Sequence, residues 1–222
     1  MGTEMSEVSQ EEIQKAAAFT ANEELGGTKS GRKFLSGKLG KKLAEVMFNT
    51  FEQNAKLNTE VVRDPDTGLY NKAYLVKELD IRINDTKKPF AVIWVDMDNL
   101  KTMNDKNGHE VGTEMIIGLS RLLENKIRPN ENGFVARYGG DEFVLVIPGM
   151  TEIENVMKRA KDINSLVSAT EFRTSKGKIR QTVSLGAGIW DGKESRTELL
   201  ERVDSAMYEA KKQGRDKVVQ AK

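Results

Sequence analysis

The chain has 222 residues, of which 38% are apolar, and its 35 basic and 34 acidic side chains leave a formal net charge of +1. This length and apolar content predict one globular domain plus an extension, and the charge gives no overall reason to expect nucleic acid or a membrane surface as partner. The absence of cysteine excludes a disulfide framework, a thiolate zinc site and a cysteine nucleophile, and it favours a cytoplasmic location. No apolar run approaches the roughly 20 residues that a membrane-spanning helix needs.

Residues 1–60 are predicted to form a helical extension and linker, because they contain no convincing strand and several glycines interrupt them. The first helical stretch, Glu11–Leu25, has too few apolar positions for a core of its own. The second, from Leu39 to about Val61, has apolar residues at spacings of three, four and seven. This pattern is as typical of a helix packed on its own domain as of a two-stranded coiled coil joining two copies. The basic segment at 29–42 lacks aromatic neighbours, so no nucleic-acid partner is expected there.

Strands and helices alternate in the second predicted domain, residues 61–222. The unbroken apolar run Phe90–Val95 is typical of a strand covered on both faces. Gly139 and Gly140, between two strand-like runs, predict a tight hairpin. The order of elements predicts an α/β fold of βαββαβ type. The expected helices are 71–84, 113–127, 152–170 and 197–213, and the expected strands are 90–95, 134–138, 143–148 and 181–190.

Four acidic residues are predicted to meet at one edge of this sheet. Asp96 and Asp98 follow the buried strand, and Asp141 and Glu142 form the tip of the hairpin. If the two strands are neighbours, the clustered carboxylates would repel one another unless they bound a hard divalent cation such as Mg²⁺. Taken separately, such acids belong to solvent-facing turns more often than to metal sites, but their predicted placement together favours the metal site.

Three cations are candidates for binding phosphate groups. Lys211 and Arg215 are four residues apart near the end of the last predicted helix, which would place them on one face. Basic residues in a last helical turn also commonly interact only with the helix dipole. Arg137 precedes the acidic hairpin tip directly and is the third candidate.

The hairpin and three further blocks resemble GGDEF-domain diguanylate cyclases over roughly residues 62–220. The hairpin block is Arg137-Tyr-Gly-Gly-Asp-Glu-Phe143, which carries the family signature. The other blocks are the opening turn Asp64–Asn71, the metal-strand and base-pocket block Asp96–His109, and the closing helix block Asp204–Arg215. Four blocks in the same order are far more specific than the signature alone.

The resemblance implies a palm-like fold with a central, mostly antiparallel sheet flanked by helices. It implies that each protomer binds one nucleoside triphosphate, and that a homodimer joins two of them into a cyclic dinucleotide. Asp96, Asp141 and the Met97 carbonyl would hold Mg²⁺ or Mn²⁺, and Glu142 would assist the metal site or accept the 3′-hydroxyl proton. A non-catalytic nucleotide-binding module is the alternative, and the near-neutral charge argues against a template-using polymerase.

The nucleotide contacts carried over from the family involve the phosphates, the base and the hairpin backbone. Lys211 and Arg215 would bind the terminal phosphates and Asn104 the base, while the paired glycines would let the nucleotide lie against the backbone. His109 is expected to be structural. The candidate nucleotide-binding residues are therefore Asn104, Thr113, Arg137, Gly139, Gly140, Lys211 and Arg215.

Two departures from the family pattern carry expectations of their own. Thr113 stands where the family typically has an aspartate that reads guanine, which is similar to the hybrid branch that makes cyclic GMP-AMP beside cyclic di-GMP. A hydroxyl penalises adenine less than a carboxylate does, so both GTP and ATP are expected as substrates, with a strict diguanylate cyclase as the alternative. Asn130 and Gly133 replace the Arg and Asp of the product-inhibition motif, so feedback through that site is not expected.

Overall fold

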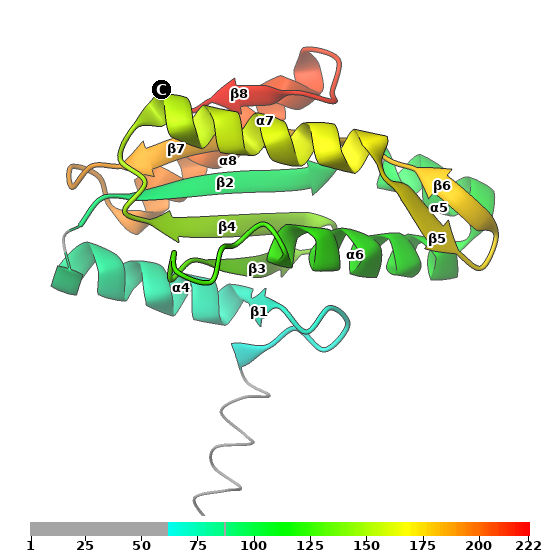
Figure 1. Ribbon diagram of the computed structural model, residues 1–222, viewed down its shortest axis with the longest axis horizontal. Helices are drawn as coiled ribbons and strands as arrows, with labels where there is room; N and C mark the ends of the chain where they lie inside the picture. Colours follow the sequence, from blue (N-terminus) through cyan, green and yellow to red (C-terminus); the bar gives the residue numbers. More distant parts are fainter. Residues whose placement is uncertain (1–61, 87) are drawn as a thin grey trace, which may run out of the picture. The chain divides into compact units, whose positions relative to one another are not determined.

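The structure is a computed structural model that describes residues 62–86 and 88–222, and these form one mixed sheet covered by helices (Figure 1). The two helical stretches, the possible coiled coil and the basic segment predicted within residues 1–60 lie outside the described residues. Within the described part of the chain, no helix is both long and apolar enough to cross a membrane.

The central sheet has six strands in the order β1-β3-β4-β2-β7-β8. The inner strand β2 runs antiparallel to β4 and β7, and β3 runs antiparallel to β4, whereas the short edge strands β1 and β8 pair in parallel. The predicted mostly antiparallel sheet is thus confirmed. The strands are β1 Tyr70–Asn71, β2 Phe90–Met97, β3 Phe134–Gly139, β4 Glu142–Pro148, β7 Val183–Trp190 and β8 Val218–Gln220.

Helices cover both faces of this sheet. In Figure 1, α6 and α7 lie in front of the sheet and α8 lies behind it. A separate two-stranded hairpin, β5–β6, packs beside α6. The helices are α4 Lys72–Ile81 with a π-helical extension Arg82–Thr86, α5 Leu100–Asn107, α6 His109–Glu124, α7 Ile153–Ala169 and α8 Arg196–Lys212, and the hairpin strands are β5 Glu171–Thr174 and β6 Gly177–Arg180.

Strand β2 is buried along its whole length because hydrophobic clusters lie on both of its faces. Ile93 and Val95 belong to the cluster that includes residues of α6 and α7. Val92 and Trp94 belong to the cluster that includes residues of α4 and α8. This two-sided burial confirms the interpretation of the unbroken apolar run.

Helix α8 packs directly against the backbone of β7 because residue 186 is a glycine. A Cβ built on Gly186 would lie 2.1 Å from the carbonyl oxygen of Val203 and 2.6 Å from the amide nitrogen of Met207. No side chain fits between the helix backbone and the strand here. This close approach fixes the height of α8 over the sheet and, with it, the position of Lys211.

The structure corrects several predicted element boundaries. Strand β2 continues to Met97, and the helix expected from Thr113 begins at His109. Helix α8 ends at Lys212, so the expectation that Arg215 shares a helical face with Lys211 was wrong. Helix α5 and the strands β1, β5, β6 and β8 were not predicted, because they are short or polar and give little hydrophobic periodicity.

Candidate functional site

The end of β2 and the hairpin between β3 and β4 meet as predicted. Asp96 is the register partner of Glu142, and the amide of Met97 donates to the carbonyl oxygen of Asp141 at 3.4 Å. Gly140 makes the hairpin turn with φ +51°, a conformation that favours glycine. The pairing of β2 with β4 therefore brings Asp96, Asp141 and Glu142 together at the ends of these inner strands. We call this group the acidic edge.

Asp96 is a buried carboxylate whose two oxygens have different surroundings. Only 3% of the residue is exposed. Its Oδ2 forms an ion pair with Nζ of Lys211 at 2.7 Å, whereas its buried Oδ1 has no hydrogen-bond partner among the described residues. Burial, with Asp141 nearby, raises the pKa of Asp96 to about 7 although Lys211 opposes the shift. An unpartnered, buried carboxylate oxygen is suited to binding a cation.

Asp204 of α8 joins this acidic edge, a contribution that sequence reasoning missed. Burial and the charges of Asp204 and Asp141 raise the pKa of Glu142, and burial raises the pKa of Asp204 itself. Asp204 lies seven residues before Lys211 on α8, so both occur on one side of the helix. That spacing was the available signal.

Asp98 does not belong to the acidic edge, contrary to expectation. Its Oδ1 accepts a hydrogen bond from the hydroxyl of Ser184, and its Oδ2 accepts one from the hydroxyl of Thr182, both at 2.7 Å. The residue is only 3% exposed, and its carboxylate is already supplied with donors. It is therefore part of the protein framework, and it is absent from the set that could hold a metal.

The donors at the acidic edge fit a hard divalent cation. Asp96 and Asp141 offer carboxylate oxygens, and carboxylate, carbonyl, phosphate and water oxygens are the ligands that Mg²⁺ prefers. Among residues 62–86 and 88–222, no group of three or more His, Asp or Glu side chains is close enough together to hold a metal ion without other ligands. Such a cation would therefore share its coordination shell with water and with the phosphates of a bound nucleotide.

The two predicted phosphate-binding cations lie in different settings. Lys211, near the end of α8, is engaged with Asp96. Arg215 follows the helix in a left-handed conformation with φ +64°, and its guanidinium makes no hydrogen bond or ion pair with the described residues. Arg215 is exposed and free to bind an anion.

Arg137 of β3 connects the opening turn to the hairpin. Its Nη1 lies 3.0 Å from Oδ1 of Asp64 and 2.8 Å from Oδ2 of Asp66, and its Nε donates to the carbonyl oxygen of Gly140 at 2.9 Å. Burial lowers the pKa of Arg137, but the hydrogen bonds to Asp66 and Asp64 outweigh it and raise the pKa above its ordinary value. In this arrangement Arg137 holds the hairpin tip in place.

The predicted base-reading residues lie on α5 and α6. The Oδ1 atom of Asn104 is buried without a hydrogen-bond partner among the described residues. It lies against Gly112, where an added Cβ would be 1.9 Å away. Thr113 is exposed, and its Oγ1 donates to the carbonyl oxygen of His109 at 3.1 Å. Sequence reasoning missed Gly112, whose neighbour Asn104 is eight residues earlier.

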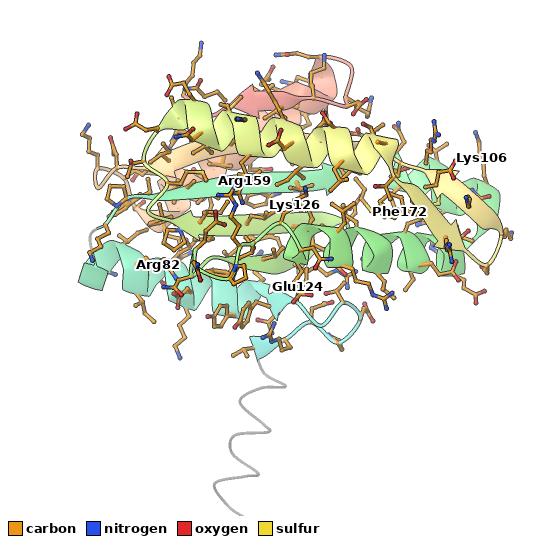
Figure 2. All side chains as sticks on the ribbon, in the orientation of Figure 1. Arg82, Lys106, Glu124, Lys126, Arg159 and Phe172 are labelled. Carbon is orange, nitrogen blue, oxygen red and sulfur yellow. The ribbon has the colours of Figure 1, made fainter. Side chains whose placement is uncertain are left out.

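Near Asn130 and Gly133, where the product-inhibition motif is absent, Arg159 is already paired with groups of the protein. Figure 2 labels Arg159 of α7 and Lys126 close together, and Nη1 of Arg159 donates to the Lys126 carbonyl oxygen at 2.8 Å. Nη2 of Arg159 also pairs with Oε1 of Glu131 at 2.7 Å. The neighbouring cavity of about 470 Å³ is lined by residues that include Arg128, Glu131, Lys158 and Arg159.

The chain matches the family model described as "Diguanylate cyclase, GGDEF domain" over residues 61–217. It is 33% identical over 163 residues to diguanylate cyclase DosC of Escherichia coli (strain K12), covering 72% of this chain and 35% of DosC. Diguanylate cyclase DgcM of the same organism is 35% identical over 161 residues, which are 71% of this chain and 38% of DgcM. The chain thus spans little more than a third of the length of these relatives.

A solved structure has the same fold. The crystal structure of the coiled coil and GGDEF domain of DgcB from Caulobacter crescentus, in complex with c-di-GMP, matches with a TM-score of 0.76 and 27% identity, covering 85% of this chain and all of that one. None of the three names refers to a mixed cyclic dinucleotide. The expectation of a hybrid specificity therefore depends on Thr113 alone.

Proposed function

Because the chain belongs to the GGDEF-domain diguanylate cyclase family, we propose that it condenses two nucleoside triphosphates into a 3′,5′-cyclic dinucleotide and releases pyrophosphate. The observation that carries this proposal is the register between Asp96 on β2 and Glu142 at the hairpin tip, with Lys211 beside them. Carboxylates for a metal and cations for a polyphosphate occur together, as phosphoryl transfer requires.

The acidic edge would hold Mg²⁺ or Mn²⁺. Asp96, Asp141 and the Met97 carbonyl would be its ligands, and Glu142 would assist them or accept the proton of the attacking 3′-hydroxyl. When bound, the metal supplies a lower pKa for that hydroxyl and neutralises the charge of the leaving pyrophosphate. Burial and the nearby carboxylates raise the pKa of Glu142 above its ordinary value, which makes Glu142 a better proton acceptor than an ordinary glutamate.

The triphosphate would be bound by Lys211 and Arg215 and would lie along the hairpin. Added Cβ atoms at Gly139 and Gly140 would meet no protein atom within 4 Å, so the space above this backbone is open. Arg137 would contribute by holding the Gly140 carbonyl, and hence the hairpin, in position.

Catalysis would require a homodimer. The described residues offer one acidic edge and one set of phosphate-binding cations, which is enough for one nucleotide, whereas the reaction joins two. Each protomer would bind one triphosphate, and a twofold arrangement would place each 3′-hydroxyl in line with the α-phosphate of the other nucleotide. Nucleic acid and membrane surfaces are not expected as partners.

GTP is the expected substrate, and we propose that ATP is also accepted. Asn104 would contact the base, and Thr113 stands where an aspartate typically accepts from guanine. Since the Thr113 hydroxyl hydrogen is donated to His109, its oxygen can accept from guanine or from the adenine amino group alike. Cyclic di-GMP and 3′,3′-cyclic GMP-AMP would then both be products. The names of the relatives favour the second candidate, strict diguanylate cyclase activity.

Mass spectrometry of the products formed from GTP, from ATP and from their mixture, each with Mg²⁺, tests whether the chain makes a cyclic dinucleotide and whether it uses ATP as well as GTP. We expect cyclic di-GMP from GTP alone and an additional mixed product from the mixture. Thr113→Asp should restore preference for GTP. Cyclic di-GMP as the sole product from every mixture would refute relaxed selectivity.

Asp141→Asn separates an enzyme from a binding module. The substitution is nearly isosteric, so the variant should fold and lose activity. Absence of any cyclic dinucleotide from the wild-type chain would refute the enzymatic proposal itself.

A further inference from the structure

The turn after α8 has a strained backbone. Three consecutive residues, Gly214, Arg215 and Asp216, have φ values of +105°, +64° and +47°. Gly214 ends the helix in a Schellman arrangement, in which its amide donates to Lys211 and the amide of Arg215 donates to Ala210. Left-handed conformation costs non-glycine residues about 1 kcal/mol or more each, so the surroundings must hold Arg215 and Asp216 in this form.

Asp98 provides the main hydrogen-bond anchor for this turn. The amide of Asp216 donates to Oδ2 of Asp98 at 3.1 Å, across 118 residues of chain. The same oxygen accepts from Thr182, and the other oxygen accepts from Ser184. The hydroxyls fix the orientation of the carboxylate, and the carboxylate fixes the amide of the residue that follows Arg215.

Further contacts secure Asp216 from its other side. Nδ2 of Asn164, on α7, donates to Oδ1 of Asp216 and to the carbonyl oxygen of Val183, both at 3.0 Å. The carbonyl oxygen of Lys217 accepts from Leu185 of β7 at 2.9 Å. The backbone around Arg215 is thereby tied to the sheet, while its guanidinium has no partner among the described residues.

We propose that Asp98 is a positioning residue for substrate binding: it holds the left-handed turn so that Arg215 meets the terminal phosphates of the nucleoside triphosphate. This inference rests on the proposed function for the identity of the ligand. It gives the second aspartate of the Asp96-Met97-Asp98 segment a different task from the first. Asp96 would bind the metal, and Asp98 would act through the backbone of Asp216.

The chemistry of the network predicts different effects for two substitutions. Asp98→Ala removes both carboxylate oxygens and leaves the Asp216 amide without its partner. Asp98→Asn keeps one oxygen for that amide, and its NH₂ group can donate to the oxygen of Ser184, because a hydroxyl also accepts. The asparagine variant should therefore retain most of the wild-type behaviour.

Calorimetric binding of a nonhydrolysable GTP analogue and of GMP tests the phosphate role in the full chain. We expect Asp98→Ala to weaken the triphosphate about 10-fold or more, consistent with loss of a charge-assisted contact, and to leave GMP nearly unchanged. Arg215→Ala should do the same, and the double variant should lose little more than either single variant. The surface variant Asp191→Ala serves as the matched control and should bind like the wild type.

Additive losses in the double variant, or an equal loss for GMP and the triphosphate, would overturn the proposal. So would Asp98→Ala with unchanged triphosphate affinity. These outcomes separate a positioning role from general destabilisation, because a merely loosened fold would weaken both nucleotides together.

Amide hydrogen exchange without nucleotide gives a readout that does not depend on the proposed function. Asp98→Ala should accelerate exchange at Asp216 while the amides of β4 stay protected, and Asp98→Asn should restore protection. Unchanged exchange at Asp216 would overturn the anchoring role. A wild-type chain that binds no triphosphate, combined with accelerated exchange in Asp98→Ala, would refute the proposed function and the phosphate role but not the anchor.

Discussion

Nζ of Lys211 lies 2.7 Å from Oδ2 of Asp96, so a cation expected to bind phosphate neutralises a carboxylate expected to bind metal. When a metal and a triphosphate enter together, both residues can exchange their mutual contact for these new partners. The ligand-free site is thus kept from accumulating uncompensated buried negative charge.

Replacing Lys211 should affect metal and nucleotide in opposite directions. Lys211→Met frees Asp96, so we expect the nucleotide-free chain to bind Mn²⁺ several-fold more tightly above pH 8, measured by electron paramagnetic resonance. The affinity for a nonhydrolysable GTP analogue should fall about 10-fold or more, since a charged phosphate contact is lost. Lys212→Met is the control, because Lys212 pairs with Glu209 at the surface. Unchanged Mn²⁺ affinity in Lys211→Met would contradict the exchange.

The stability of the metal-free chain should depend on the ionisation of Asp96. Burial raises the pKa of Asp96 to about 7, whereas an unfolded aspartate titrates near 4. Between these values the folded chain keeps a proton that the unfolded chain has released, so this residue lowers the free energy of unfolding as the pH rises from about 4 to about 7. Glu142 and Asp204, with raised pKa values, act in the same direction.

Asp96→Asn removes this ionisation and should stabilise the metal-free chain by about 1–3 kcal/mol at pH 8, with a much smaller gain at pH 4. Urea unfolding at both pH values measures the effect. An equal gain at both values would show that ionisation of Asp96 is not its cause. Activity should be lost in the same variant, because the carboxylate is a proposed metal ligand.

The hairpin glycines allow fold and ligand binding to be separated. A Cβ at Gly139 meets no atom within 4 Å, so Gly139→Ala should change the free energy of unfolding by less than about 1 kcal/mol. The methyl group would occupy the space proposed for the nucleotide, and the affinity for a GTP analogue should fall about 10-fold or more. Gly140→Ala, in contrast, should destabilise the fold by about 1 kcal/mol in addition to weakening binding, since Gly140 has φ +51°. Normal binding by Gly139→Ala would place the nucleotide elsewhere.

The sheet and most of the acidic edge could be predicted because their signals are local in sequence. The apolar run of β2 and the paired glycines of the hairpin identify two strands, and their pairing brings Asp96 to Glu142. The hydrophobic pattern of the sequence does not predict α5, because this helix is polar, or β8, because this strand is short.

The wrong predictions concern residues whose positions depend on contacts with distant parts of the chain or on the backbone conformation of a neighbour. The Asp98 carboxylate accepts hydrogen bonds from the hydroxyls of Thr182 and Ser184, which are 84 and 86 residues later in the chain. No sequence-spacing rule predicts these contacts. Arg215 leaves the helical face of Lys211 because Gly214 adopts φ +105° and ends the helix. A glycine permits such an end but does not require it.

Added cyclic dinucleotide should not inhibit through the surface near Asn130. The nearby Arg159 is committed to Glu131 and to the Lys126 carbonyl, so it is not free to bind a ligand. Arg159→Met should leave initial rates in the presence of product unchanged, while lowering the free energy of unfolding by about 2 kcal/mol, because Glu131 loses its buried ion pair and keeps only its contacts with Arg128. Strong product inhibition that an Asn130 variant abolishes would contradict this prediction.

Gly112 should control the position of the Asn104 amide, the proposed base contact. A Cβ at this position would lie 1.9 Å from Oδ1 and 2.8 Å from Cγ of Asn104, so Gly112→Ala must displace that side chain. Because the displaced group is the end of a flexible side chain, and alanine favours a helix by up to about 1 kcal/mol over glycine, the stability should change little.

The consequence for binding should be confined to the base. Gly112→Ala is expected to weaken a nonhydrolysable GTP analogue about 10-fold, whereas inorganic tripolyphosphate, which lacks a base, should bind as it does to the wild type. Gly118→Ala on the same helix is the matched control, because its Cβ would meet the Phe172 ring at 2.7 Å rather than Asn104. It should alter stability without affecting the ratio of the two affinities. Equal weakening of both ligands by Gly112→Ala would mean that the phosphate site, and not the Asn104 amide, had moved.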